Sequence, residues 1–389
     1  MPDPLRIMEA DDELWQQYND LATRSYGHPV GDITRLRPHT DIRVALRDGN
    51  VVAGGLGLLT NQFFGGAPVP SAIISAGCVA PEERGDHLAS RLLTERLRPL
   101  REQGAVISTA WTTSNGHLRH LGWQAPVPVF AWSIATEDLK RSFTSHGLHI
   151  EHGRAKEGEE LQRHLARNWN GPVQRPDWWS AWMDDKQRLT TYRFGTDGTT
   201  TGVLSLSMKR HPRHGTDLTV HDFWAADAET VNEMMAFLGG HHTRAATVHF
   251  RRSALPPYPV LLHHLHRYRL TAEAWHPWML RILDIPEAVR LRGWPTDLAI
   301  AVPMEIESES GGKSDTYLLE VKDGTGQITK TRAHGEIQLT RGQLAVWYAG
   351  GYQTANAARL AGVAATSDEA LTQLIRATSD LEAWLPEHI

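Results

Sequence analysis

Hydrophobic and polar positions in the first third of the chain switch between strand-like and helix-like spacing. Residues 42–59, IRVALRDGNVVAGGLGLL, hold two apolar runs around Asp48-Gly49-Asn50, and predict a hairpin because Gly and Asn tolerate a positive φ. Residues 67–81 predict a further strand. Leucines then recur at helical spacing from residue 88 to 100, and Pro99 is expected to kink or end that helix. With a strand over 104–111, the pattern indicates a mixed α/β unit.

Two further segments follow a polar stretch that begins near residue 133. The second has strand-like runs at 201–210 and 217–225, then a helix whose N-cap is Asp227. The third starts near Ile285, and its capping-box patterns at Thr340 and Thr366 predict two helices. We therefore predict three domains, over residues 1–135, 136–284 and 285–389.

Composition excludes several classes of protein. The chain has 389 residues, a net charge of −5, 41% hydrophobic and 22% charged residues, which is ordinary for a globular protein without a nucleic-acid footprint. A single cysteine, Cys78, excludes an intrachain disulfide framework and favours the reducing cytoplasm. The acidic start and the absence of a long apolar run argue against a signal peptide and a membrane span.

The stretch VAPEERGDHLASRLL, residues 79–93, has the form of a phosphate-binding turn between a strand and a helix. In such turns of acetyltransferases the pattern is Arg/Gln-x-x-Gly-x-Gly/Ala. Here Arg84 occupies the first position, but His87 stands where the first glycine is expected, and Asp86 precedes it.

Three stretches together resemble the enhanced-intracellular-survival (Eis) type of the GNAT acetyltransferase superfamily: the turn just described, AWTTSNGHLRHLGW at 110–123, and residues 280–294 with 339–363. The resemblance implies an α/β (α+β) fold of two tandem GNAT-like mixed-sheet domains and a sterol-carrier-like third domain. It also implies acetyl transfer from acetyl-CoA to a small-molecule amine, and a homo-oligomer that is often a hexamer.

The resemblance further assigns the cofactor site. It implies that backbone and side chains of these residues contact CoA: Cys78, Val79, Arg84, Gly85, Asp86, His87, Leu88, Ala89 and Asn115. Glycine is needed where backbone must approach a phosphate closely, and a carboxylate beside that phosphate repels it. His87 and Asp86 therefore predict a weakened, degenerate CoA site.

The resemblance also points to catalytic positions. The tyrosine that acts as general acid in the family aligns with Trp123, whose indole is only a donor; this ring is either a packed wall or a stacking surface for a ligand. The family's base is the terminal carboxylate, here that of Ile389. If the chemistry has changed, His87, His117 and His120 are the expected acid and base groups.

Two functions therefore remain open at this point. One is an acyl-CoA-dependent N-acetyltransferase with a weakened cofactor site. The other is a GNAT scaffold without CoA that catalyses acid/base chemistry, such as dehydration or cyclisation, on a secondary metabolite, or binds one. No metal site is expected, because His263, His264 and His266 lack a further ligand at suitable spacing.

Overall fold

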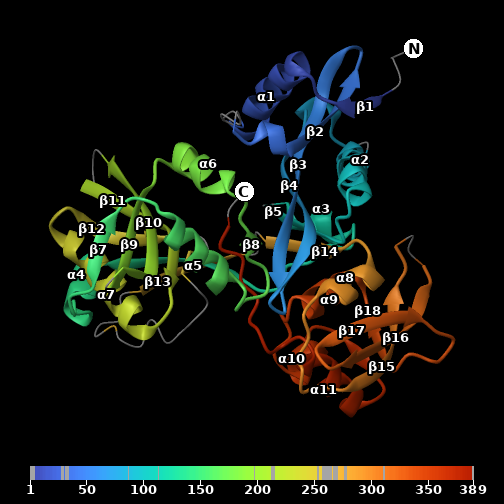
Figure 1. Cartoon of the computed structure of the whole chain (residues 1–389). Helices are drawn as coiled ribbons and strands as arrows, with labels where there is room; N and C mark the ends of the chain where they lie inside the picture. Colours follow the sequence, from blue (N-terminus) through green and yellow to red (C-terminus); the bar gives the residue numbers. More distant parts are fainter. Residues whose placement is uncertain are drawn as a thin grey trace. The chain divides into compact units, whose positions relative to one another are not determined.

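The computed structural model describes residues 5–27, 30, 35–85, 87–112, 114–196, 198–211, 215–251, 254–255, 265, 270–275, 278–309 and 312–387. They form two compact units, one from residues 1–126 and 277–382 and the other from 127–276 and 383–388 (Figure 1).

The first sheet has the strand order β1-β2-β3-β4-β5-β14. Its strands are β1 (Arg6–Glu9), β2 (Thr40–Arg47), β3 (Asn50–Phe64), β4 (Ala67–Val79), β5 (Ile107–Trp111) and β14 (Trp278–Ile282). The predicted hairpin is confirmed: β2 pairs with β3, and Asp48 and Gly49 both have positive φ. Helices α1 (Asp12–Tyr26), α2 (Leu88–Glu102) and α3 (Asn115–Arg119) belong to this part of the chain, with 3-10 turns η1 (Arg37–His39) and η2 (Pro81–Glu83).

Helix α2 buries the predicted leucine stripe against β2, β3 and β4. Of the two predicted effects of Pro99, a kink or an end, the end is wrong, because the helix continues past Pro99 to Glu102. A proline within the last turn removes one internal hydrogen bond, and the amide of Gln103 still closes the helix on the carbonyl of Pro99, 3.1 Å away.

The second sheet has the order β13-β6-β12-β11-β10-β9-β7. Its strands are β6 (Val129–Ala135), β7 (His149–His152), β9 (Thr190–Thr196), β10 (Thr199–His211), β11 (Gly215–Ala225), β12 (Ala245–Phe250) and β13 (Leu270–Trp275). Helices α4 (Thr136–Ser142), α5 (Lys156–Ala166), α6 (Trp178–Gln187) and α7 (Ala228–Gly239), the turn η3 (Gly240–Thr243) and the short strand β8 (Val173–Gln174) complete this unit. It is a mixed sheet because β11 and β12 run parallel and the other pairs are antiparallel.

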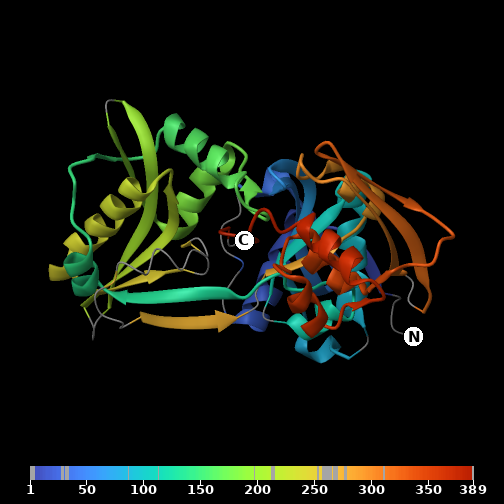
Figure 2. The same cartoon turned by 90° about the horizontal axis from the view of Figure 1, so that it is seen from below.

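Two strands fall on the other side of the boundaries expected at 135/136 and 284/285. Strand β6 was placed in the first domain, but it pairs with β12 and β13 in the second sheet (Figure 2). Strand β14 was placed in the second domain, but it pairs with β5 in the first sheet. Each sheet thus takes a strand from sequence that the local pattern assigns to its neighbour, an edge strand (β14) in the first sheet and an inner strand (β6) in the second.

The third sheet has the order β17-β16-β15-β18-β19. Its strands are β15 (Ile300–Glu307), β16 (Ser314–Lys322), β17 (Thr325–Lys330), β18 (Ile337–Leu339) and β19 (Ala364–Ala365), with helices α8 (Ile285–Leu291), α9 (Arg341–Tyr348), α10 (Ala355–Leu360) and α11 (Asp368–Arg376). The three parts of the chain are mixed-sheet α+β domains, as predicted. No helix in the described ranges is long and apolar enough to cross a membrane.

The two predicted capping boxes have different outcomes. The box at Thr340 is confirmed, since Thr340 and Gln343 bond each other's backbone amides. The box at Thr366 is wrong by one residue: Ser367 caps α11 by accepting from Ala370. The amide of Thr366 instead donates to the carbonyl of Glu336, and Thr366 precedes the cap rather than forming it.

Candidate active site

Strands β4 and β5 separate in the first domain. Their parallel pairing runs from Ser71 to Ile74 and ends there, while β4 continues beside β3 to Val79. At the point of separation the β3–β4 register shifts, so that Ala76 and Gly77 lie opposite the single residue Gly55. This bulge leaves the last part of β4 without a β5 neighbour.

Side chains from both flanking helices bond the carbonyls of this bulge. Arg96 of α2 donates to the carbonyl of Ser75 at 2.6 Å, and Tyr18 and Tyr26 of α1 donate to those of Ala76 and Gly77. Arg96 is buried, and burial lowers its pKa. Three successive carbonyls are thereby held in place.

Sequence reasoning missed Arg96, although a signal was present. An arginine occupies a core position within the leucine stripe of α2, and the β3 residue that faces it is Gly55. A Cβ on Gly55 would lie 2.3 Å from the guanidinium carbon of Arg96, so only glycine admits the side chain. An arginine within an apolar helix stripe, together with two adjacent glycines in a neighbouring strand, indicates that the arginine side chain is buried against that strand.

The turn before α2 keeps the backbone that the family glycine would adopt. His87 is the N-cap, with φ 55° and ψ 17°, in the left-handed region that favours glycine. Its side chain is exposed and does not cap the helix, and among the residues that the structure describes no side chain is seen to bond the amides of Leu88 and Ala89. Those amides and the helix dipole leave an anion-binding end open. Asp86 lies outside the described residues.

The corresponding helix of the second domain, α7, has a side-chain cap at its N-terminus. Helix α7 follows β11 after only Ala226 and Asp227, and the Asp227 side chain accepts from the amide of Thr230 at 2.8 Å. An internal carboxylate therefore occupies the place where a phosphate would bind. The two helices thus differ at their N-caps, since the Asp227 side chain caps α7 and the His87 side chain does not cap α2.

The other predicted cofactor residues lie around this turn. Cys78 and Val79 end β4; Cys78 is buried, and burial raises the pKa of its thiol to about 11, so it is no nucleophile at neutral pH. Arg84 and Gly85 are exposed in the turn, Leu88 packs into the core beneath α2, and Ala89 is half-buried. Asn115 begins α3, and its Oδ1 is enclosed without a hydrogen-bond donor.

Tertiary structure brings the three predicted histidines together. The pKa of His117 on α3 is lowered by burial and then by the charges of His120 and His87. His87 precedes α2 while His117 and His120 follow β5, so the fold joins positions that are about thirty residues apart in the sequence. Within the described residues no cluster of metal-ligating side chains is present.

Trp123 does not line an open surface. Its side chain is 0% exposed and packs in the core with Ile74, Leu97 and Met279. Its Nε1 has no hydrogen-bond partner. The position is thus a packed wall, and the alternative of an exposed stacking surface is corrected. Ile389, like His263, His264 and His266, lies outside the described residues.

A second polar centre, in the other unit, was not predicted. The Arg175 guanidinium donates to Asp222 Oδ1 and Oδ2 at 2.6 and 2.9 Å, and to Glu387 Oε1 at 2.9 Å. Glu387 Oε2 also accepts from the amide of Val173 at 3.0 Å. One arginine therefore serves two carboxylates.

Charge and burial shift the pKa values of the two carboxyl groups of this centre in opposite directions. Burial opposes ionisation of Asp222, but Arg175 holds the pKa of Asp222 below its usual value. The pKa of Glu387 is raised, because burial outweighs the attraction of Arg175. Near neutral pH the arginine and Asp222 are an ion pair, and Glu387 is the group of the three that most readily takes up a proton.

The same centre fixes the last described residues of the chain. Trp384 packs edge-on against Trp169 and tilted against Trp224, with ring centroids 5.2 and 4.9 Å away. Its amide donates to the carbonyl of Asn170 at 2.8 Å. The role of the Ile389 carboxylate as the base stays a prediction.

Comparison with known proteins agrees with these domains. Two acetyltransferase (GNAT) domain models match residues 6–125 and 171–282, and a sterol carrier protein domain model matches residues 285–386. The chain belongs to the GNAT acetyltransferase family. It is a tandem GNAT with a sterol carrier domain.

Relatives of this tandem GNAT share its architecture at low identity. An uncharacterized N-acetyltransferase of Streptomyces griseus is 23% identical over 319 residues, 74% of each chain. The solved GCN5-related N-acetyltransferase of Anabaena variabilis has a TM-score of 0.87 and 23% identity, covering 99% of this chain and 100% of its own. Eis1 of Mycobacterium abscessus has a TM-score of 0.76 and 17% identity, with 100% of both chains covered. These structural likenesses show the fold.

Proposed function

We propose that this tandem GNAT is an acyl-CoA-dependent N-acyltransferase that acetylates a small-molecule amine, with acetyl-CoA bound by the first domain. The observation that carries the proposal is the uncapped N-terminus of α2 at the end of a strand that has separated from β5. That combination offers amide donors for a diphosphate and an unpaired strand edge for an extended amide-containing chain.

Residues of this chain divide the work of the reaction. The first amides of α2 would hold the diphosphate of CoA, and the enclosed Asn115 Oδ1 would be available to accept a hydrogen bond from the cofactor. Acetyl-CoA supplies the activated acyl group. The acceptor amine must lose a proton before it attacks the thioester, and the carboxylate of Ile389 is the base that the family resemblance assigns.

Binding is expected to be weak for reasons visible in the turn. The backbone of His87 already has the required conformation, but its imidazole stands beside the path to the helix amides. Asp86, the residue before His87 in the sequence, adds a negative charge. At an exposed site this repulsion costs on the order of 1 kcal/mol, which weakens CoA without abolishing its binding.

Calorimetry with acetyl-CoA tests this function. We expect weak binding by the wild type and stronger binding by the paired change Asp86→Arg with His87→Gly, together with faster amine-dependent release of CoA. Tight binding by the wild type that the substitutions leave unchanged would show that the turn is not the phosphate site.

A second candidate function is supported by the histidine cluster. Burial, and then the charges of His120 and His87, lower the pKa of His117, and Trp123 stands at the position of the family's general acid. We infer that a scaffold without CoA would use these imidazoles for acid/base chemistry on a secondary metabolite. Acetyl-CoA should then leave the melting temperature of the wild type unchanged, and His87→Gly should abolish the native activity.

A further inference from the structure

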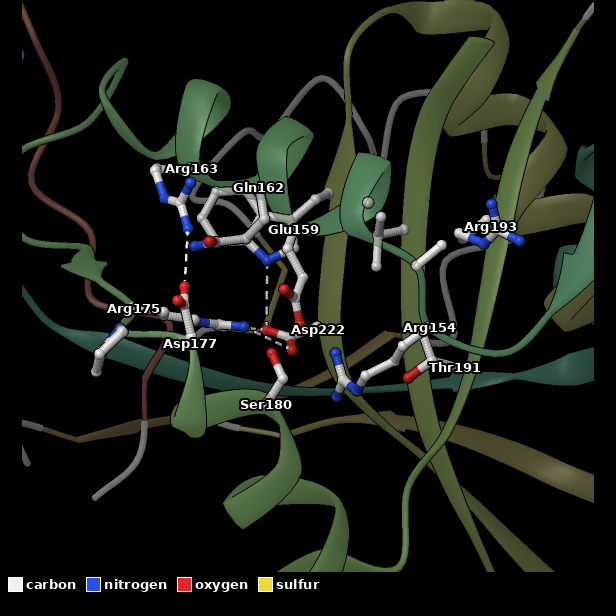
Figure 3. A pocket seen from close by; sticks show the side chains of 15 residues that line it. Arg154, Glu159, Gln162, Arg163, Arg175, Asp177, Ser180, Thr191, Arg193 and Asp222 are labelled. Atoms are coloured by element: carbon white, nitrogen blue, oxygen red, sulfur yellow. Dashed lines mark hydrogen bonds and ion pairs between the residues drawn. The ribbon is translucent and has the colours of Figure 1, made fainter. Parts of the chain in front are cut away.

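The second domain contains a pocket of its own. Its walls come from α5, from the segment that leads into α6, and from the sheet face of β9, β10 and β11. The empty space at the pocket is roughly 500 Å³ when open solvent is included, and about 20 Å³ of it admits the centre of a water-sized sphere. Figure 3 shows Glu159 and Gln162 on one side, with Asp222 and Ser180 opposite.

Every arginine in the wall of this pocket has its own counter-charge. Arg154 forms a two-bond pair with Asp184 at 2.6 and 2.7 Å, and Arg175 is bonded by Asp222 and Glu387. Arg193 pairs with Glu151, and Arg163 lies 3.7 Å from Asp177. Carboxylates thereby offset the arginine charges of this wall, most weakly at Arg163, whose pair with Asp177 is exposed.

Two wall groups are left without partners. Gln162 is 6% exposed, and its Nε2 has no hydrogen-bond acceptor. Glu159, one turn before it on the same helix, makes no ion pair or hydrogen bond with the described residues. A buried donor without an acceptor costs stability, so a folded protein that keeps one calls for an acceptor from elsewhere.

We propose that this pocket is a binding site for a small organic cation, a protonated amine with a neighbouring carbonyl or hydroxyl oxygen. Glu159 supplies the negative charge for the ammonium group, and Gln162 Nε2 donates to the oxygen. Since all four arginines are paired, the unbalanced charge of the wall is that of Glu159, which selects a cation over an anion. The site is argued independently of acyl transfer in the first domain.

Glycinamide is the probe, because it carries one ammonium and one carbonyl group. A chemical-shift titration of the full-length ¹⁵N-labelled protein should move the side-chain amide of Gln162, while acetamide and acetate should not. Glu159→Gln should weaken glycinamide by about tenfold. The matched control is Glu160→Gln, which removes the same charge from the exposed neighbour that pairs with Lys156, and should change affinity by less than about twofold.

The variant Gln162→Leu tests whether Gln162 serves ligand binding or the stability of the fold. Removing an unsatisfied buried donor should raise the melting temperature by about 2 °C and weaken glycinamide by at least about fivefold. The proposal fails if Gln162→Leu lowers the melting temperature, if acetate binds as well as glycinamide, or if Glu159→Gln and Glu160→Gln have equal effects. Melting curves of each variant confirm that the titrated protein is folded.

Discussion

Arg175 and Glu387 are 212 residues apart in the sequence and form a buried pair, with 2.9 Å between Nε and Oε1. The Glu387 side chain is 0% exposed and that of Arg175 is 11% exposed. The same guanidinium binds Asp222, so one cation joins β11, the segment before α6 and the last described residues. The centre therefore stabilises the second domain and fixes the chain end within it.

Arg175→Met should strongly destabilise the second domain. It leaves two carboxylates buried beside each other without their cation, and breaking a buried pair in this way costs about 3–5 kcal/mol. Urea unfolding measures the change. Arg163→Met is the control, since the Arg163–Asp177 pair is exposed and should contribute less than about 1 kcal/mol. Equal losses in the two variants would contradict a special role for Arg175.

Deletion of the chain end should depend on where it begins. Removing residues 386–389 takes away Glu387, and leaves Arg175 and the amide of Val173 with one acceptor fewer each. We expect a loss of about 2–3 kcal/mol in stability. Removing only residues 388–389 keeps Glu387 and should leave stability within about 0.5 kcal/mol, while acyl transfer is lost if Ile389 carries the base. An unchanged transfer rate in the shorter deletion would exclude that base.

His87→Gly should stabilise the first domain. The left-handed backbone at φ 55° costs a residue with a Cβ about 1–2 kcal/mol, and glycine removes that cost at some expense in unfolded-chain entropy. The net gain should be about 0.5–1 kcal/mol by urea unfolding. Arg91→Gly, at an exposed position inside α2, should instead cost about 1 kcal/mol. Destabilisation by both changes would mean that His87 makes a contact worth more than its strain.

Acid should destabilise the second domain through His221. Burial, then the charge of Arg251, lowers the pKa of His221 to about 4 from an ordinary 6.5, although Asp222 acts in the opposite direction. Between these two values the unfolded chain holds a proton that the folded one does not, so stability is present above pH 6.5 and is lost as the pH falls toward 4. The loss should reach about 2–3 kcal/mol.

The test is the difference between the wild type and His221→Gln over this pH range, because Glu387 and other carboxyl groups titrate in both. The variant should show a shallower fall in stability. His120→Gln, at an exposed histidine, serves as the control and should follow the wild type. Parallel curves for the wild type and His221→Gln would contradict the prediction.

The sequence by itself determined the local elements of this protein. Periodicity and capping residues predicted the hairpin at Asp48, the helix after Asp227 and the helix after Thr340. These features depend on residues that are close in the sequence, so the local sequence pattern is enough to predict them. Motifs spread over three segments also indicated the family and its three domains.

Only the tertiary structure decided which distant segments meet. The exchange of β6 and β14 between the expected domains, the burial of Arg96 under the β4 bulge, and the joining of Arg175 to Glu387 follow from pairings across tens to hundreds of residues. A strand pattern carries its period but not its partner, and a charged residue is buried only where the fold supplies its counter-charge or acceptors. His87 shows both limits: the sequence marked the missing glycine, while the fold kept the glycine's backbone conformation and placed the side chain in solvent.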